Sequence, residues 1–189
     1  TSMVDPLFAA GAVTAIGVGV GGPMSVGGAD VSPLNIPAWR GFPLKQRLDD
    51  RYRVPVSVDN DAKALALGEG RWGAAQGIDN YLAMVVSTGV GGGLVLNGRL
   101  LDGEAGNAGH IGHMIVEPDG HTCACGVRGC LEAEASGSGI ARWAGLEPEL
   151  ADVSVRRRTG TMVGRAVASV ANLLDLRLAV VAGSVALGY

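Results

Sequence analysis

Three cysteines stand within eight residues of this chain: Cys123, Cys125 and Cys130. Thiolates at this spacing can share one zinc ion, which takes four ligands in a tetrahedron, and the neighbouring glycines allow the backbone to fold around a small ion. Three histidines lie close enough in the sequence to supply the fourth ligand: His110, His113 and His121. Chemistry alone does not choose among them. The cluster predicts a structural zinc site in a reducing compartment, and three ordinary thiols without a metal are the alternative.

A glycine-rich stretch follows an apolar run at residues 87–93, where the sequence reads Ser-Thr-Gly-Val-Gly-Gly-Gly. Glycines let backbone amides approach phosphate oxygens, and Thr88 adds a hydroxyl donor. The stretch is not a Walker A loop, because that loop ends in Gly-Lys followed by Ser or Thr. It predicts a phosphate-binding loop, and a tight β-turn without a ligand is the alternative.

The polar triplet Asp59-Asn60-Asp61 closes a short apolar run. Loops after strands are where α/β proteins place reactive groups. A carboxylate there can accept a hydroxyl proton during phosphoryl transfer, and a neighbouring amide can bind sugar hydroxyls. The alternative is that one of the three simply caps the helix after the triplet.

The elements that must position these groups are strands mixed with helices. Apolar runs predict strands at residues 12–20, 54–58, 81–87, 94–96, 114–117 and 179–182. Helical propensity and periodicity predict helices at residues 42–52, 62–72, 131–143 and 162–174. Asn97-Gly98 predicts a hairpin turn, and residues 21–43 are expected to be mostly loop. The mixture predicts the α/β class.

One motif points to a different chemistry and is rejected. Residues 17–22 match Gly-x-Gly-x-x-Gly after a predicted strand. The dinucleotide-binding fingerprint also requires a helix to follow at once, whereas the next residues are rich in proline, serine and glycine. A Rossmann-type site is therefore not expected here.

Composition excludes several classes of protein. With 48% hydrophobic and 17% charged residues among 189, the chain is expected to fold into a globular structure. A net charge of -3 argues against direct contact with nucleic acid, and the run Arg156-Arg157-Arg158 is interpreted as a solvated helix face. No apolar stretch reaches the roughly 20 residues that span a bilayer, and no basic leader precedes the first apolar run. We therefore expect a cytoplasmic protein without a membrane partner.

Together these motifs resemble the ROK family of bacterial sugar kinases and sugar-responsive repressors. Residues 35–39 (Asn-Ile-Pro-Ala-Trp) are similar to the family's Asn-Leu-Pro-x-Trp segment, and residues 56–62 to its strand ending in Glu-Asn-Asp-Ala. Residues 88–93 match its second phosphate loop. Residues 109–113 (Gly-His-Ile-Gly-His), the cysteine cluster and residues 129–132 (Gly-Cys-Leu-Glu) match its zinc and sugar segment, which is the most specific of these motifs.

The resemblance implies an actin-like ATPase (ribonuclease H-like) fold, with two α/β lobes, a central cleft and a zinc-binding loop. Residues 1–76 would be the remainder of the N-terminal lobe and residues 77–189 the C-terminal lobe, with the phosphate loop and the zinc and sugar segment. It also implies a glucokinase-like, ATP-dependent hexose kinase that uses Mg²⁺ with ATP, contains structural Zn²⁺ and forms a homodimer.

The same resemblance implies residue roles. Asp61 would be the general base on the attacking sugar hydroxyl. Hexose would be bound by Asn60, Asp61, His110, His113 and Glu132. The nucleotide would lie against Thr88, Gly89, Val90, Gly91, Gly92 and Gly183. Zinc would be held by His113, Cys123, Cys125 and Cys130.

The chain departs from the family pattern in three ways. It contains no Asp-x-Gly-Gly-Thr phosphate segment, so we expect it to begin after that hairpin. His110 stands where many family sugar kinases have a sugar-binding glutamate, which puts the sugar preference in doubt. Residues 150–161 are expected to be shorter than in relatives. Two further functions therefore stay open: a sugar-responsive transcriptional regulator, and a truncated sugar-binding member without turnover.

Overall fold

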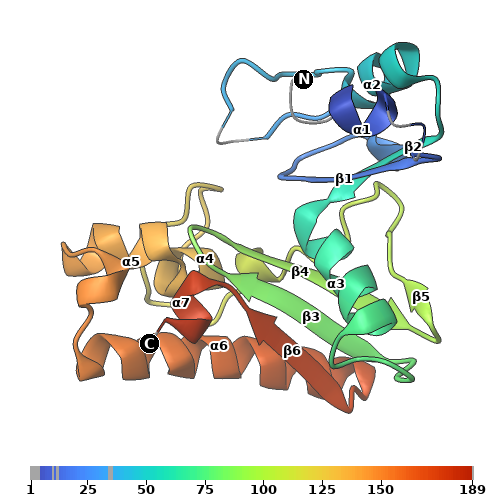
Figure 1. The fold of residues 1–189 in the computed structure, drawn as a ribbon. Coiled ribbons are helices and arrows are strands. Elements are labelled where there is room, and N and C mark those ends of the chain that lie inside the picture. Colours follow the sequence, from blue (N-terminus) through green and yellow to red (C-terminus); the bar gives the residue numbers. More distant parts are fainter. Residues whose placement is uncertain (1–4, 10, 12, 34–35, 189) are drawn as a thin grey trace. The chain divides into compact units, whose positions relative to one another are not determined.

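The structure is a computed structural model that describes residues 5–9, 11, 13–33 and 36–188 (Figure 1). The chain divides into two compact units. Unit 1 comprises Thr1–Ala64 and Asp102–Asn107, and unit 2 comprises Leu65–Leu101 and Ala108–Tyr189. The division at residue 76 that the resemblance implied stays a prediction. Among the described residues, no helix combines the length and apolar character needed to cross a membrane.

Unit 1 is built on two parallel strands, β1 (Ile16–Val20) and β2 (Val56–Asn60), which pair in register from Ile16 with Val56 to Val20 with Asn60. Their apolar side chains pack with α2 (Leu44–Tyr52) and with the stacked rings of Trp39 and Phe42, whose centroids lie 4.4 Å apart. The unit also contains the short helix α1 (Asp5–Ala9) and the 3-10 turn η1 (Val26–Gly28). This core positions the carboxyl end of β2, where the polar triplet lies.

Among the described residues, the chain after β1 does not form the helix that a dinucleotide-binding fingerprint requires. The strand runs into a bend, an isolated bridge at Met24 and the turn η1, and the next α-helix along the described residues is α2. Without a helix directly after the glycines, no helix N-terminus is offered to a pyrophosphate. Gly19 has a packing role instead, because a Cβ there would lie 3.2 Å from the Cα of Asp61.

Unit 2 is a four-stranded sheet of order β5-β4-β3-β6. The strands are β3 (Tyr81–Val86), β4 (Val90–Leu96), β5 (Arg99–Leu100) and β6 (Leu178–Ala182). β3 is antiparallel to β4 and parallel to β6. Asn97 and Gly98 turn the β4–β5 hairpin with φ values of 52° and 71°, which confirms the predicted turn.

The central strand β3 is buried on both faces because a helix covers each one. Leu82, Met84 and Val86 pack with the long helix α6 (Val153–Leu174), drawn in orange below the sheet in Figure 1. Tyr81 and Ala83 pack on the opposite face with Ala66 of α3 (Asp61–Trp72), which begins in unit 1 and continues into unit 2. The remaining elements are η2 (Ile111–His113), α4 (Leu131–Ala135), α5 (Gly137–Ala144), η3 (Pro148–Leu150) and α7 (Ser184–Leu187).

Several predicted boundaries are wrong. The expected helix 131–143 is two helices, because the Ser136 hydroxyl accepts from the Gly139 amide and starts α5 afresh. The helix expected from Met162 begins at Val153, where Asp152 caps it. Residues 114–117 form no strand and contribute only an isolated bridge between Ile115 and Cys130. The first strand begins at Ile16; residue 12, where it was expected to start, lies outside the described residues.

Candidate functional site

The side chains of His113, Cys123, Cys125 and Cys130 converge on one point in unit 2. One potential ligand atom from each lies within 4.8 Å of all the others. The Sγ atoms of Cys125 and Cys130 are 3.6 Å apart, and His113 Nδ1 is 3.9 Å from Cys123 Sγ. Tetrahedral zinc with Zn–S bonds of about 2.3 Å separates its sulfur ligands by about 3.8 Å, so these two distances are close to those of a zinc site.

The backbone folds around the cluster as a small hairpin. Thr122 and Arg128 form an antiparallel bridge, and the Cys123 amide donates to the Val127 carbonyl at 2.8 Å. Gly126 turns the hairpin with φ 89°. Gly129 has φ 78°, and a Cβ there would collide with the Glu117 carbonyl oxygen, so only glycine fits. The two glycines between Cys125 and Cys130 therefore allow the turn that brings the cysteines together.

The environments of the three thiols differ. Burial raises the pKa of Cys123, and it raises the pKa of Cys130 to about 12. A hydrogen bond from the Val127 backbone lowers the pKa of the exposed Cys125. Zinc binds thiolates, so a metal entering this site displaces protons from the two buried thiols. Among the described residues the candidate cluster takes in His113 and neither of the other two histidines, and the role of His113 as a zinc ligand stays a prediction.

The predicted phosphate loop lies at the carboxyl end of β3 and is held by the helices beside it. The backbone amides of Gly137 and Ser138 at the start of α5 donate to the carbonyls of Ser87 and Thr88, at 2.7 and 3.1 Å. The Ser87 and Ser184 hydroxyls lie 2.9 Å apart. Gly183 is also at this end, because a Cβ on it would lie 2.3 Å from the Val86 carbonyl oxygen. The structure thus brings Gly183 and the loop together, and the assignment of both to the nucleotide stays a prediction.

Most of the glycine run is strand rather than loop. β4 begins at Val90, four residues earlier than predicted, so only residues 87–89 turn. A Cβ on Gly92 would lie 2.9 Å from Ile111 Cγ2, and one on Gly109 would lie 2.4 Å from the Gly92 carbonyl oxygen. These glycines therefore allow the 109–113 segment to lie directly on β4. The assignment of Gly91 and Gly92 to the nucleotide stays a prediction.

Glu132 joins the predicted sugar segment to the predicted phosphate loop. Its Oε2 accepts a hydrogen bond from the Val90 amide at 3.2 Å, and a Cβ on Gly89 would lie 3.2 Å from the same oxygen. The half-buried carboxylate belongs to α4, which begins directly after Cys130. The helix therefore starts where the cysteine hairpin ends, and it places Glu132 at the loop.

The two histidines of the sugar segment belong to the short turn η2: His110 is its N-cap and His113 its last residue. Their rings meet edge to face, with centroids 6.2 Å apart, and both residues are exposed. His113 presents Nδ1 to the cysteine cluster. Its Nε2 is on the other side of the ring and makes no hydrogen bond to any residue that the structure describes, so it can serve a second ligand, as in metal sites where the two imidazole nitrogens have separate partners.

The polar triplet lies at the junction of β2 and α3 in unit 1. Asp59 Oδ1 accepts from the Asn60 amide at 2.7 Å, while Asn60 Oδ1 and Asp61 Oδ1 both accept from the Ala62 amide, at 3.0 and 2.9 Å. Asp61 is exposed, and within the described part of the chain its Oδ2 makes no hydrogen bond. Capping and a catalytic role are therefore compatible, because one oxygen caps α3 and the other is available.

The structure also contains a buried ion pair that the sequence did not suggest. Glu134 is fully buried and accepts from Arg158, from the His121 amide and from His121 Nδ1, the last at 3.0 Å. The Arg158 guanidinium lies 4.5 Å from the ring centroid of Trp143, which also stacks with His121. Burial alone would raise the pKa of Glu134, but the hydrogen bonds from Arg158 and His121 outweigh it and the pKa is lowered. Arg158 is thus not part of a merely solvated face.

Replacing Glu134 by glutamine is expected to destabilise the protein by about 3 kcal/mol. The reason is that the exchange leaves the Arg158 charge half-buried without its counter-ion. Glu149→Gln on the exposed turn η3 is the matched control and should stay within about 0.5 kcal/mol of the wild type. Denaturant unfolding of the three proteins measures the difference, and equal midpoints would contradict a structural role for this pair.

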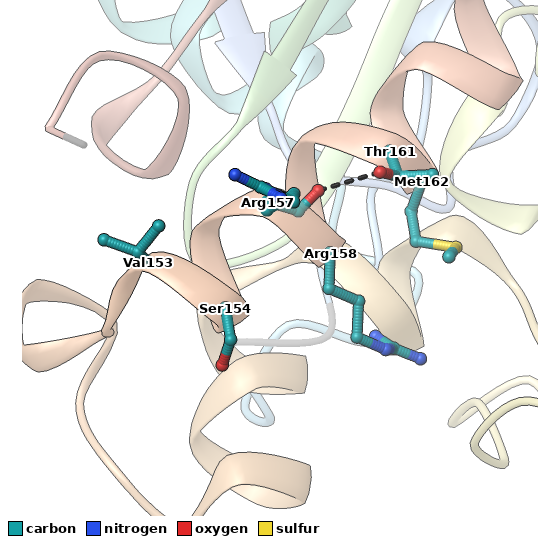
Figure 2. Close-up of a pocket in the computed structure, with 6 residues that line it drawn as sticks. All are labelled: Val153, Ser154, Arg157, Arg158, Thr161 and Met162. Atoms are coloured by element: carbon teal, nitrogen blue, oxygen red, sulfur yellow. Dashed lines mark hydrogen bonds between the residues drawn. The ribbon is translucent and has the colours of Figure 1, made fainter.

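A hollow of about 570 Å³ lies along the first part of α6 (Figure 2). Its lining comes from that helix alone: Val153, Ser154, Arg157, Arg158, Thr161 and Met162. None of the predicted sugar, nucleotide or metal residues lines it, and the Thr161 hydroxyl donates to the Arg157 carbonyl within the helix. The hollow is therefore separate from the candidate site.

The predicted residues thus gather in two groups. Asn60 and Asp61 belong to unit 1; the phosphate loop, His110, Glu132, Gly183 and the metal ligands belong to unit 2. Asn35, with which the family's proline–tryptophan segment was expected to begin, lies outside the described residues.

Comparison with known proteins points to one family. A sequence model described as the ROK family matches residues 1–188. A glucokinase from Halalkalibacterium halodurans is 49% identical over 131 residues, which cover 67% of this chain and 39% of that protein. The matching part of this chain covers 41% of a glucokinase from Thermotoga maritima. The chain therefore spans about two-fifths of the length of these curated relatives.

Solved structures agree with the sequence comparison. A ROK hexokinase from Thermus thermophilus superposes with a TM-score of 0.83 at 38% identity, covering 92% of this chain and 63% of that one. A ROK family glucokinase from Streptomyces griseus, in complex with glucose and AMPPNP, gives a TM-score of 0.80 at 32% identity, covering 99% and 73%. A ROK family transcriptional regulator gives a TM-score of 0.78 at 29% identity, covering 98% of this chain and 55% of that one. These similarities imply the expected actin-like ATPase fold.

Proposed function

This chain belongs to the ROK family, and we propose that it is part of an ATP-dependent hexose kinase of the glucokinase type. The observation that carries the proposal is the contact between Glu132 and the loop at residues 87–90, with Oε2 3.2 Å from the Val90 amide. It places a carboxylate suited to sugar hydroxyls beside amides suited to phosphate. A kinase needs those two binding functions next to each other, because the hydroxyl attacks the terminal phosphoryl group.

In this proposal the chemistry of each polar group determines which part of the substrates it binds. Hexose hydroxyls are bound by the Asn60 amide, the Glu132 carboxylate and the imidazoles of His110 and His113. These groups are neutral or singly charged, which suits a neutral polyol better than a strongly charged pocket does. His110 in place of the family's glutamate can still donate to or accept from a hydroxyl, and it is the position where we expect the choice of hexose to be set.

Asp61 acts as the general base. Its free Oδ2 takes the proton from the attacking hydroxyl as the bond from oxygen to the γ-phosphorus forms and the bond to the leaving ADP oxygen breaks. Thr88, the Gly89 amide, Val90, Gly91, Gly92 and Gly183 lie against the nucleotide. Mg²⁺ bound with ATP would neutralise phosphate charge.

The zinc ion in this proposal is structural. Its donor set is closed, with three thiolates and one imidazole, so no ligand position is left for a substrate. Binding fixes the hairpin that leads into α4, and so fixes Glu132; it also holds the His113 ring with Nε2 toward the hexose. We retain the homodimer as part of the proposal.

A second function has specific support, because a transcriptional regulator is among the matching structures and covers 98% of this chain. The zinc and sugar residues serve a sugar-responsive regulator equally well. A family member that binds sugar without turnover also remains an outcome of the experiment. The three functions differ in what the whole protein does once sugar is bound.

The test is phosphoryl transfer by the full-length protein. We expect glucose-dependent release of ADP from ATP and Mg²⁺, with the sugar phosphate identified by mass spectrometry; mannose and N-acetylmannosamine complete the panel. Hexose binding by calorimetry without ADP release would contradict the kinase and support a binding protein. Sugar-dependent binding to DNA, without transfer, would support the regulator.

A further inference from the structure

Lys63 is a buried cation that none of the proposed roles uses. Its side chain is 2% exposed, which is rare for a lysine. The chain contains 13 arginines but only two lysines, Lys45 and Lys63. Among the described residues of unit 1, Lys63 is the only buried charged residue, and its compact ammonium offers three donors. A planar guanidinium would not offer the same three directions from one atom.

Three oxygens from two separate stretches of unit 1 surround this ammonium. Asp102 Oδ1 lies 2.6 Å from Nζ and the Gly106 carbonyl oxygen 3.0 Å away. Asp59 Oδ1 completes the set at 3.6 Å. The carboxylates are themselves partly solvated, with side-chain exposures of 37% for Asp59 and 66% for Asp102, so the buried partner is the ammonium. Such a charge stays buried only while its oxygens remain in place.

Both stretches that Lys63 joins lead to predicted sugar ligands. Asp59 Oδ1 also accepts from the Asn60 amide, so Lys63 and Asn60 share one carboxylate oxygen. On the other side, residues 102–107 belong to unit 1 although the chain before and after them belongs to unit 2. That loop runs into the sugar segment, with Gly106 four residues before His110.

We propose that Lys63 is a positioning residue of the hexose site. Its ammonium holds the Asp59–Asn60 turn and the 102–107 loop in one arrangement, and thereby orients Asn60 and the start of the sugar segment without touching the sugar. The inference rests on the proposed function, because it takes Asn60 and His110 as hexose ligands. The oxygens that surround Lys63 all belong to unit 1, whereas the nucleotide residues all belong to unit 2, so we expect the effect to be confined to the sugar.

The experiment compares Lys63→Met with the same exchange at the only other lysine, Lys45→Met on α2, in the full-length protein. Lys63→Met should raise the KM and the calorimetric Kd for hexose by roughly tenfold or more, because displaced ligands bind poorly. The KM for ATP should change by less than about twofold, given that the nucleotide groups are not moved. Lys45→Met should leave both values unchanged.

Two milder variants keep the test decisive where Lys63→Met does not fold. Lys63→Arg retains the charge and should raise the hexose KM by less than Lys63→Met does. Asp102→Asn removes one charged partner that water can replace, and should raise the hexose KM by roughly two- to fivefold. In both variants the KM for ATP should again stay near the wild-type value.

The outcomes separate this inference from the proposed function. Wild-type hexose affinity in Lys63→Met, or in both milder variants, contradicts the role of Lys63 while leaving the kinase intact. An equal rise in both KM values with a lowered unfolding temperature indicates a merely structural lysine and also contradicts it. A wild-type protein that neither binds nor phosphorylates a hexose contradicts both proposals.

Discussion

Asp61→Asn in the full-length protein is expected to lower the rate of hexose phosphorylation by about 10²- to 10⁴-fold, which is the usual contribution of a general base. The side-chain oxygen of asparagine can still accept the hydrogen bond from the Ala62 amide, so the fold and the hexose site should persist. Because proton transfer matters in the transition state and not in ground-state binding, kcat should fall while hexose binding remains measurable by calorimetry.

The adjacent carboxylate is the matched control. Asp59 Oδ1 already accepts from the Asn60 amide and pairs with Lys63, whereas Asp61 is exposed with an oxygen to spare. Asp59→Asn should therefore affect the hexose KM more than kcat. A variant at Asp61 with near wild-type turnover would remove this residue as the base, and an equal loss of kcat in the Asp59 variant would show that the triplet acts as a unit.

Elements whose burial is encoded locally could be predicted from the sequence. β3 is a run of six apolar residues that is buried on both faces, and α3 follows a capping triplet with strong helix formers. The Asn97-Gly98 hairpin depends on two residues with positive φ, which the dipeptide favours. The three cysteines of the candidate metal cluster could be predicted from their spacing, and its histidine, His113, from the resemblance to the family.

Elements that depend on distant partners could not be predicted. The helix expected across residues 131–143 breaks at Ser136, where the Gly137 amide donates to Ser87, fifty residues earlier in the chain. Lys63 is buried by partners 39 and 43 residues away. Glu134 and Arg158 are 24 residues apart, and nothing in either local sequence indicates the other. Likewise, the strand conformation of β4 from Val90 was not predicted, because the 109–113 segment that lies on its glycines is not visible in the local pattern.

The second large effect concerns the metal. We expect about one zinc ion per chain in the full-length protein, because the four donors already stand at distances that suit a tetrahedral ion. A chelator should then lower the unfolding temperature, since a ligand that binds only the folded state stabilises it. The largest loss of protection from hydrogen exchange should fall on the hairpin at residues 122–130 and on the start of α4, which comes directly after it.

Ligand variants test the same site one residue at a time. Cys125→Ser removes an exposed member of the cluster, and His113→Ala removes its nitrogen donor. Each should weaken zinc binding by more than the roughly 10- to 100-fold that loss of an outer partner costs, with partial unfolding of the hairpin. Competition with a chromogenic chelator measures the affinity, and metal analysis gives the stoichiometry.

The other two histidines supply the controls. His110→Asn and His121→Asn should each retain about one zinc ion, because neither imidazole belongs to the cluster. The two controls should differ from each other: His110→Asn is expected to alter hexose affinity, whereas His121→Asn loses a hydrogen bond to Glu134 and is expected to lower stability instead. An intact, metal-free wild-type protein would contradict the assigned ligand set. So would loss of zinc from the His121→Asn variant together with its retention by the His113→Ala variant. Either result would also remove the physical reason for Glu132 and His113 to be fixed beside the phosphate loop.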